Sequence, residues 1–179
     1  QLITYMFMHD PFSFGHVFFN MFSVFMFGRT LEAVWGGKRF LVFYMATGIG
    51  AGLVQELTWY LSLHEAIVNT EIAFGWEQTR YMLNNIITIG ASGAVFGILL
   101  AFGMLFPNAE LFLMFIPVPI KAKYFVIGYG LIELFLGIRS SSGGGDIIAH
   151  FAHLGGMLFG LILILYWRKK GGNSHGYFG

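Results

Sequence analysis

Five long apolar stretches limit the folds that are open to this chain. They span residues 14–35, 40–62, 91–106, 123–138 and 147–167. Each is close to the ~20 residues that an α-helix needs to cross the hydrocarbon core of a bilayer. Because a chain in lipid must satisfy its own backbone hydrogen bonds, these stretches predict helices. The predicted fold class is therefore an all-α membrane protein, a polytopic helical bundle with five spans.

Composition agrees with this prediction and excludes several functional classes. Hydrophobic residues make up 56% of the 179 residues and charged residues only 11%, whereas soluble domains carry ~25% charged residues. The formal net charge of +1 does not indicate a nucleic-acid partner. The chain has no cysteine, which excludes thiolate catalysis, disulfides and Cys-based zinc sites. The expected surroundings are a lipid bilayer.

Polar segments divide the chain into one membrane core and a short tail. Residues 1–170 form a single predicted domain, and the Gly-rich residues 171–179 are expected to be a flexible tail. The longest polar connection, residues 64–89, is predicted to be a solvated loop that includes a short amphipathic helix. Residues 107–123 contain three prolines that break helix. Residues 139–146 are rich in Ser and Gly and predict a flexible linker.

Lysine and arginine positions predict how the chain crosses the membrane, because basic residues are retained on the cytoplasmic side during insertion. On one predicted side lie Arg29, Lys38, Arg39, Lys121, Lys123, Arg168, Lys169 and Lys170, and on the other lie Arg80 and Arg139. This majority places Gln1 outside although no signal peptide precedes it. We therefore expect an additional upstream span and a native core of six.

Polar groups within the spans converge at one depth. Such groups are costly in hydrocarbon and are functional candidates by default. His16 and Asn20 are four residues apart, so they share one helix face near the outer end of the first span. Ser92 begins the third span within a Gly-Ala-Ser-Gly motif, and His153 lies about two turns into the last span. On the predicted topology all four lie in the outer half of the membrane.

Ser92 and His153 are the predicted catalytic pair. A serine hydroxyl needs a base to accept its proton, and histidine is the usual base because it titrates near neutral pH. The oxyanion formed during acyl transfer needs hydrogen-bond donors. The side chains of Asn20 and His16 and the backbone N–H of Ser92 are the available donors. This chemistry requires no metal and no other cofactor.

Two glycine pairs predict that the third and last spans touch. Gly93 and Gly97 are four residues apart, and so are Gly156 and Gly160. Small residues at this spacing let membrane helices approach closely. Contact between the two spans would bring the predicted nucleophile within reach of its base. Serine, glycine and histidine are each common as packing residues, so it is their occurrence at one depth that favours a site.

Three motifs together resemble the rhomboid family of intramembrane serine proteases. They are His16-Val-Phe-Phe-Asn20 with Gly28 and Glu32, Gly90-Ala-Ser92-Gly93 with Gly97, and Ala152-His153-x-x-Gly156-x-x-x-Gly160. They occur in the family's order and cover most of the chain. The resemblance implies a six-helix core, a Ser–His dyad without an acidic third member, and an oxyanion site that includes Asn20 and His16. It also implies that Phe96 lies against the catalytic histidine and that His9 matches a further family histidine.

The expected activity is cleavage of other membrane proteins, single-span or polytopic, near the outer face. The substrate must present an extended segment, since a helix hides its carbonyls, and the resemblance suggests a small residue before the cut. Entry is expected to involve movement of residues 123–138 and a lid at residues 140–145. The expected location is the bacterial inner membrane, with the active site toward its outer side.

Two other functions remain as alternatives. The first is a non-catalytic rhomboid-like protein that binds transmembrane helices, although such relatives lose the Ser or the His that this chain keeps. The second is a transporter or channel, which would need a polar path to the cytoplasmic face, where the spans are apolar.

Other ionisable residues are weaker candidates. Asp146 lies seven residues before His153, or ~10 Å along one helix, and cannot orient its ring directly. His150 and His153 could clasp a metal, but no acidic or Cys residue is spaced to complete the site. Glu133 and Glu56 are expected to form interhelical hydrogen bonds or to lie near an interface.

Overall fold

The computed structural model describes residues 2–9, 14–84, 89–112, 118–141 and 147–170. Its elements are the 3₁₀-helix η1 (Thr4–Phe7), α1 (Phe14–Ser23), the π-helical turn η2 (Val24–Gly28), α2 (Arg29–Trp35), α3 (Gly37–Phe74), α4 (Trp76–Asn84), α5 (Ser92–Leu105), β1 (Glu110–Leu111), β2 (Ile120–Lys121), α6 (Ala122–Ser141) and α7 (Ile147–Lys170). Every predicted span is occupied by one helix or by one continuous run of helices. The predicted all-α membrane bundle is confirmed.

Three helical runs are long and apolar enough to cross a membrane. They are Phe14–Trp35, Gly37–Phe74 and His150–Lys170. α6 has 20 residues and carries Glu133 within it. α5 is apolar but has only 14 residues, which corresponds to ~21 Å of helix and is shorter than the ~30 Å hydrocarbon core. Because α5 is this short, its first residue, Ser92, can lie within the bundle rather than at its end.

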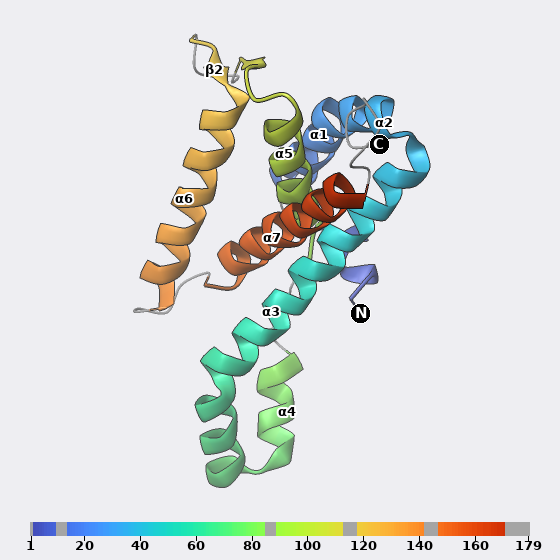
Figure 1. The fold of residues 1–179 in the computed structure, drawn as a ribbon. Coiled ribbons are helices and arrows are strands. Elements are labelled where there is room, and N and C mark those ends of the chain that lie inside the picture. The colour runs from blue at the N-terminus through green and yellow to red at the C-terminus, as the bar shows by residue number, and fades with distance from the viewer. Residues whose placement is uncertain (1, 10–13, 85–88, 113–117, 142–146, 171–179) are drawn as a thin grey trace.

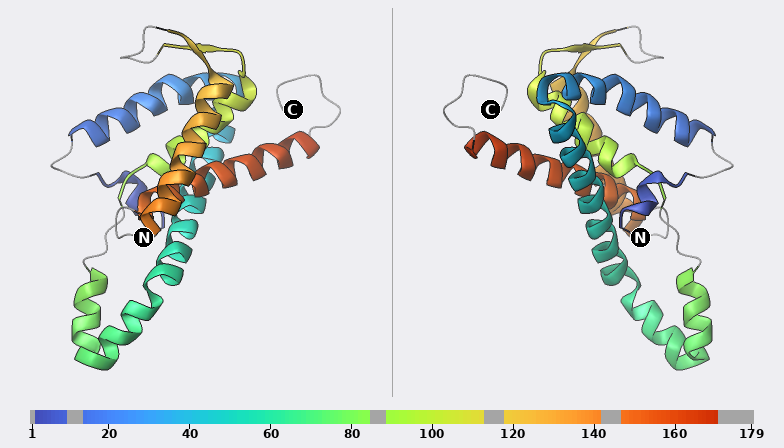
Figure 2. Two further views of the ribbon diagram at one scale, coloured as in Figure 1. Left: turned by 90° about the vertical axis from the view of Figure 1, so that its left-hand side faces the viewer. Right: turned by 90° about the vertical axis from the view of Figure 1, so that its right-hand side faces the viewer.

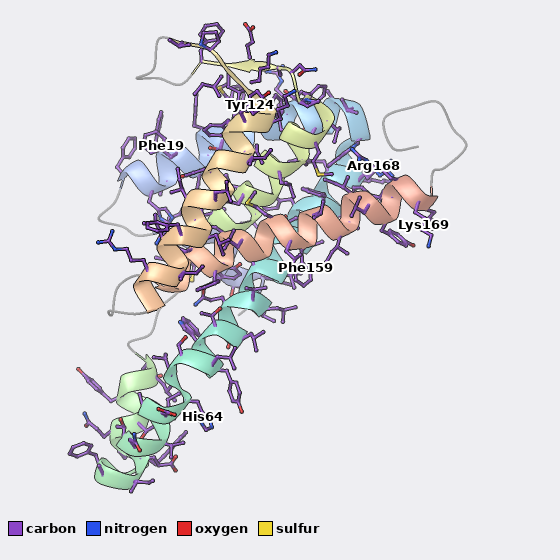
Figure 3. The ribbon with its side chains drawn as sticks, turned by 60° about the vertical axis from the view of Figure 1, so that its left-hand side comes forward. Phe19, His64, Tyr124, Phe159, Arg168 and Lys169 are labelled. Atoms are coloured by element: carbon purple, nitrogen blue, oxygen red, sulfur yellow. The ribbon has the colours of Figure 1, made fainter. Side chains whose placement is uncertain are left out.

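α5 forms the centre of the bundle. Most of its residues are buried, as expected for a helix that is apolar on all sides. α3 and α7 pack against α5 and against each other, and α6 packs against both α5 and α7. Figures 1 and 2 show α5 enclosed by these helices and by the run from α1 to α2. Figure 3 labels Phe159 of α7 near the crossing with α3, where its ring occupies the space beside Gly50.

The structure contains the predicted contact between the third and last spans. A Cβ placed at Gly156 would overlap the carbonyl oxygen of Gly93, so α5 and α7 meet backbone to backbone. One turn along, a Cβ at Gly160 would lie 3.5 Å from Cα of Gly97. A Cβ at Gly97 would itself lie 2.6 Å from Cγ2 of Thr47 on α3. The small residues of α5 therefore admit α3 as well as α7.

The predicted loop at residues 64–89 is largely helical. α3 continues to Phe74, and the chain then turns at Gly75, whose φ of +80° is a conformation that favours glycine. The short helix predicted in this region is α4, and the glutamates of the segment are exposed. The exposure of these glutamates agrees with the prediction. The predicted loop was wrong, because polar residues such as Glu65 and Glu71 interrupt the apolar stretch without ending the helix.

The two shorter connections differ in how much of them is described. In residues 107–123, Glu110 pairs with Lys121 and Leu111 with Ile120 as a short antiparallel hairpin. Arg139 completes α6 rather than starting a linker, because that helix continues to Ser141. The rest of the predicted linker and lid, residues 142–146, and the predicted tail, residues 171–179, lie outside the described residues.

Helix ends rich in basic residues gather on one side of the bundle. In Figure 1 the turn between α2 and α3, strand β2 and the C-terminal end of α7 lie toward the top. The turn between α3 and α4 lies at the bottom, and the C-terminal end of α6 lies below β2, near mid-height. This arrangement is the one that the lysine and arginine positions predict.

Candidate active site

α1 brings two predicted donors to one face of the bundle. The side chain of Asn20 is buried, and its Nδ2 atom meets no hydrogen-bond acceptor in the described part of the chain. A buried N–H without an acceptor is costly, which suits a group that donates to a bound reactant. The His16 ring lies against Gly90, where a Cβ would be 2.7 Å from its Cε1 atom. Gly90 also has a φ of +118°, so both its backbone and the histidine ring exclude a side chain there.

The N-terminal segment fixes the chain that leads into Ser92, and the sequence did not predict this role. The backbone N–H of Gly90 donates to the carbonyl of Tyr5 at 2.9 Å, and the Tyr5 hydroxyl donates to the carbonyl of Gly48 at 2.7 Å. Burial raises the pKa of Tyr5 to about 12, so the hydroxyl remains a donor. Met6 is buried in the space that Gly48 leaves open. The segment therefore links α3 to the start of α5.

His9, at the end of the same segment, lies beside His16. The ring centroids are 5.6 Å apart, and Nε2 of His9 is buried without a partner among the described residues. His16 lies against Gly90, two residues before α5, and His9 adds a second imidazole beside it. The resemblance had pointed to His9, and its position agrees with a place at the edge of the site.

Ser92 and His153 come from the two helices that meet at Gly93 and Gly156. Ser92 is the first residue of α5, and its side chain is half-buried. The ring of Phe96 stacks on that of His153 with centroids 4.1 Å apart and planes inclined by 8°. Because Phe96 and Ser92 are four residues apart on α5, they share a face, and the stacked ring places His153 on that face. The hydrogen bond that His153 makes among the described residues is to Glu133 and not to Ser92.

Glu133 of α6 is the participant whose place in this site the sequence did not predict. It is 5% exposed, and its Oε2 atom lies 2.7 Å from Nδ1 of His150 and 3.1 Å from Nδ1 of His153. The prediction that Glu133 forms interhelical hydrogen bonds is confirmed for this residue, whereas Glu56 is exposed. An ionisable residue in the middle of a predicted span was the available signal. Sequence spacing could not identify its partners.

Glu133, His150 and His153 also form the one group in the described residues that could hold a metal ion. A ligand atom from each lies within 4.8 Å of the others. The expectation that the two histidines lack an acidic partner is therefore wrong, because α6 supplies one. The observed distances from Oε2 to the two Nδ1 atoms are those of hydrogen bonds. Asp146, the other acidic residue considered near His153, lies outside the described residues.

Comparison with known proteins identifies the family. The family model described as the Rhomboid domain matches residues 1–170. The chain is 29% identical over 161 residues to "Rhomboid protein 1, mitochondrial" of Saccharomyces cerevisiae, covering 87% of this chain and 39% of that protein. It is 33% identical over 174 residues to "RHOMBOID-like protein 12, mitochondrial" of Arabidopsis thaliana, covering 94% and 46%. It spans less than half the length of both relatives, and no solved structure gave a significant match.

Proposed function

Because the chain belongs to the rhomboid family, we propose that it is an intramembrane serine endopeptidase in which Ser92 is the nucleophile and His153 its general base. The observation that carries the proposal is the junction of α5 and α7. Gly93 and Gly156 bring the two backbones into contact, and Phe96 stacks on His153 one turn beyond Ser92. Because Phe96 and Ser92 lie one turn apart on α5, this stacking supports a place for His153 on the face of α5 that carries Ser92.

The proposed reaction is acyl transfer followed by hydrolysis. Nε2 of His153 accepts the proton of the Ser92 hydroxyl while Oγ attacks the carbonyl carbon of the peptide bond. The amide of Asn20, the ring of His16 and the backbone N–H of Ser92 donate to the oxyanion. The C–N bond then breaks, and His153 returns the proton to the leaving amine. Water, activated by the same histidine, releases the acyl group from Ser92.

The proposed substrates are single-span or polytopic membrane proteins. A segment that enters the site must be extended for its carbonyl to be attacked, which favours weak helix formers near the membrane edge, with a small residue before the cut. The opening we propose for entry is a displacement of α6, which lies on one side of α5 and contacts α7 (Figure 1).

The proposed location is the inner membrane of a bacterium, with the active site toward the outer side. The orientation is supported by the basic residues at the α2–α3 turn, at β2 and at the end of α7. The mitochondrial names belong to the relatives that match the chain.

The proposal is tested by cleavage of a model transmembrane substrate in proteoliposomes. Ser92→Ala and His153→Ala should reduce cleavage to background, because either change removes half of the pair that transfers the proton. Ser62→Ala, at an exposed serine of α3, is the matched control and should cleave like the unmodified protein. Thermal unfolding in detergent should show all three variants to be folded. Wild-type rates in Ser92→Ala would reject Ser92 as the nucleophile. Binding of the substrate without any cleavage by the unmodified protein would reject the proposal in favour of a non-catalytic helix binder.

A further inference from the structure

The contacts of α6 point to a third functional side chain. We propose that Glu133 is a positioning residue for His153, whose carboxylate accepts the Nδ1–H of that histidine and leaves Nε2 unprotonated for Ser92. This inference rests on the proposed protease function and deepens it. It departs from the family resemblance, which implies a dyad without an acidic member.

Hydrogen-bond chemistry determines the protonation that the geometry requires. An ionised carboxylate only accepts hydrogen bonds. With Glu133 ionised, the 2.7 Å and 3.1 Å contacts of its Oε2 atom assign protons to Nδ1 of His150 and of His153. A neutral histidine with Nδ1 protonated has Nε2 free as an acceptor. A general base for a serine hydroxyl needs that tautomer. Glu133 therefore selects the form of His153 that can act.

α6 holds the ring of His153 as well as its tautomer. Phe96 stacks on one face of that ring, and Tyr129 of α6 stacks on Phe96 with centroids 4.9 Å apart. Tyr129 and Glu133 are four residues apart, so they share one face of α6. One face of α6 thus contacts Phe96 and also holds Nδ1 of the histidine on which Phe96 stacks.

The packing of α6 on α7 allows this short side chain to reach both histidines. Gly130 and Gly137 lie on either side of Glu133 along α6. A Cβ at Gly130 would be 3.2 Å from Cε of Met157, and one at Gly137 would be 3.3 Å from the ring of Phe151. The two helices are therefore close above and below the carboxylate.

His150 explains why the carboxylate stays in place. It donates the shorter of the two hydrogen bonds to the same oxygen, and it lies one turn before His153 on α7. A carboxylate held by a second donor has its side-chain conformation restricted, which is how supporting groups orient the residues that they contact. We infer the chain of support from His150 to Glu133 to His153.

Kinetics and histidine tautomers of the full chain test this inference together. Glu133→Gln keeps the shape but loses the charge, and its amide can turn to donate to Nδ1, which favours the inactive tautomer. We expect kcat to fall at least ~10-fold with KM unchanged, less than the ~10⁴-fold loss known for a dedicated triad acid. Glu133→Asp retains the charge on a shorter side chain, so its kcat should lie between that of Glu133→Gln and that of the unmodified protein. Glu56→Gln, at an exposed glutamate of α3, is the matched control and should leave kcat unchanged.

The tautomer is read from nitrogen NMR of histidine-labelled protein, with the signals of His153 assigned by their loss in His153→Ala. Protonation of Nδ1 in the unmodified protein, and a mixture or reversal in Glu133→Gln, is the expected result. Protonation of Nε2 in the unmodified protein overturns the inference, even if Glu133→Gln fails to fold. A kcat of Glu133→Gln equal to or above wild type also overturns it. A rise would indicate that the contacts of Glu133 hold α6 on α7 and thereby restrict substrate entry. An unmodified protein that does not cleave rejects the proposed function instead, while the tautomer still decides the role of Glu133.

Discussion

Asn20 is a buried amide whose N–H meets no acceptor among the described residues, and this state distinguishes a functional role from a structural one. A packing asparagine loses stability when it is replaced, because its partners are left unsatisfied. An asparagine whose donor awaits an oxyanion loses rate instead. The two roles therefore predict opposite combinations of rate and stability.

Asn20→Ala should reduce kcat by ~10²–10³, or about 3–4 kcal/mol, because one donor of a set is removed while the others remain. Its thermal unfolding temperature should stay the same or rise, since an unsatisfied buried donor disappears. Both are measured with the proteoliposome assay and with unfolding in detergent. Asn69→Ala, at an exposed asparagine of α3, is the control. Wild-type kcat together with a lowered unfolding temperature would make Asn20 a packing residue.

At the scale of elements, the site depends on close packing of α3, α5 and α7, which is possible because glycines lie where these helices meet. Gly93 faces Ala51 of α3 on one side and the contact with Gly156 of α7 on the other. A side chain larger than hydrogen at either glycine must move a backbone, because the atoms it meets cannot rotate away. Displacing α7 by as little as ~1 Å would misplace His153 and can cost ~10²-fold in rate.

Gly156→Val is expected to lower kcat at least ~10²-fold. Its branched side chain meets the backbone of Gly93 and would displace α7, including His153, which lies one turn before Gly156. The unfolding temperature should also fall, since the same contact holds α5 to α7. Gly128→Val is the matched control, because a Cβ at Gly128 of α6 meets no atom within 4 Å, and it should leave both quantities nearly unchanged. Equal behaviour of the two variants would show that close packing at Gly156 does not position the base.

At the scale of the whole molecule, the lysines and arginines at the helix ends predict that α4 faces the outside and that the C-terminal end of α7 faces the cytoplasm. Figure 3 labels Arg168 and Lys169 at that end of α7, remote from the turn between α3 and α4. The absence of cysteine from the chain makes this orientation directly measurable.

Single cysteines at Glu77 and Lys169, both exposed, should react from opposite sides of the membrane. In bacterial spheroplasts, whose inner membrane is intact, a membrane-impermeant maleimide should label Glu77→Cys. It should label Lys169→Cys only after the membrane is permeabilised. The unmodified chain is the background control. Labelling of Lys169→Cys in intact cells would reverse the predicted orientation and place the proposed site on the cytoplasmic side.

The fold class and the positions of the five helical spans could be predicted from the sequence alone, and the sequence also predicts a site that includes Ser92. Lipid imposes a length and an apolar composition on a spanning helix, so these spans are visible without any knowledge of their neighbours. The spacings of His16 with Asn20 and of the paired glycines are also local, because one helical turn relates their members. What a single helix encodes could be predicted from the chain alone.

Several contacts between helices depend on how the helices dock, and the sequence did not predict these contacts. Glu133 reaches histidines that lie 17 and 20 residues away, and Tyr5 reaches Gly48 across 43 residues. Such pairs are formed by the docking of one helix on another, which the period of a sequence does not specify. α3 continues to Phe74 for a related reason, since polar residues such as Glu65 and Glu71 interrupt the apolar stretch without ending the helix. The acidic partner of His153 could therefore be found only when α6 and α7 were seen side by side.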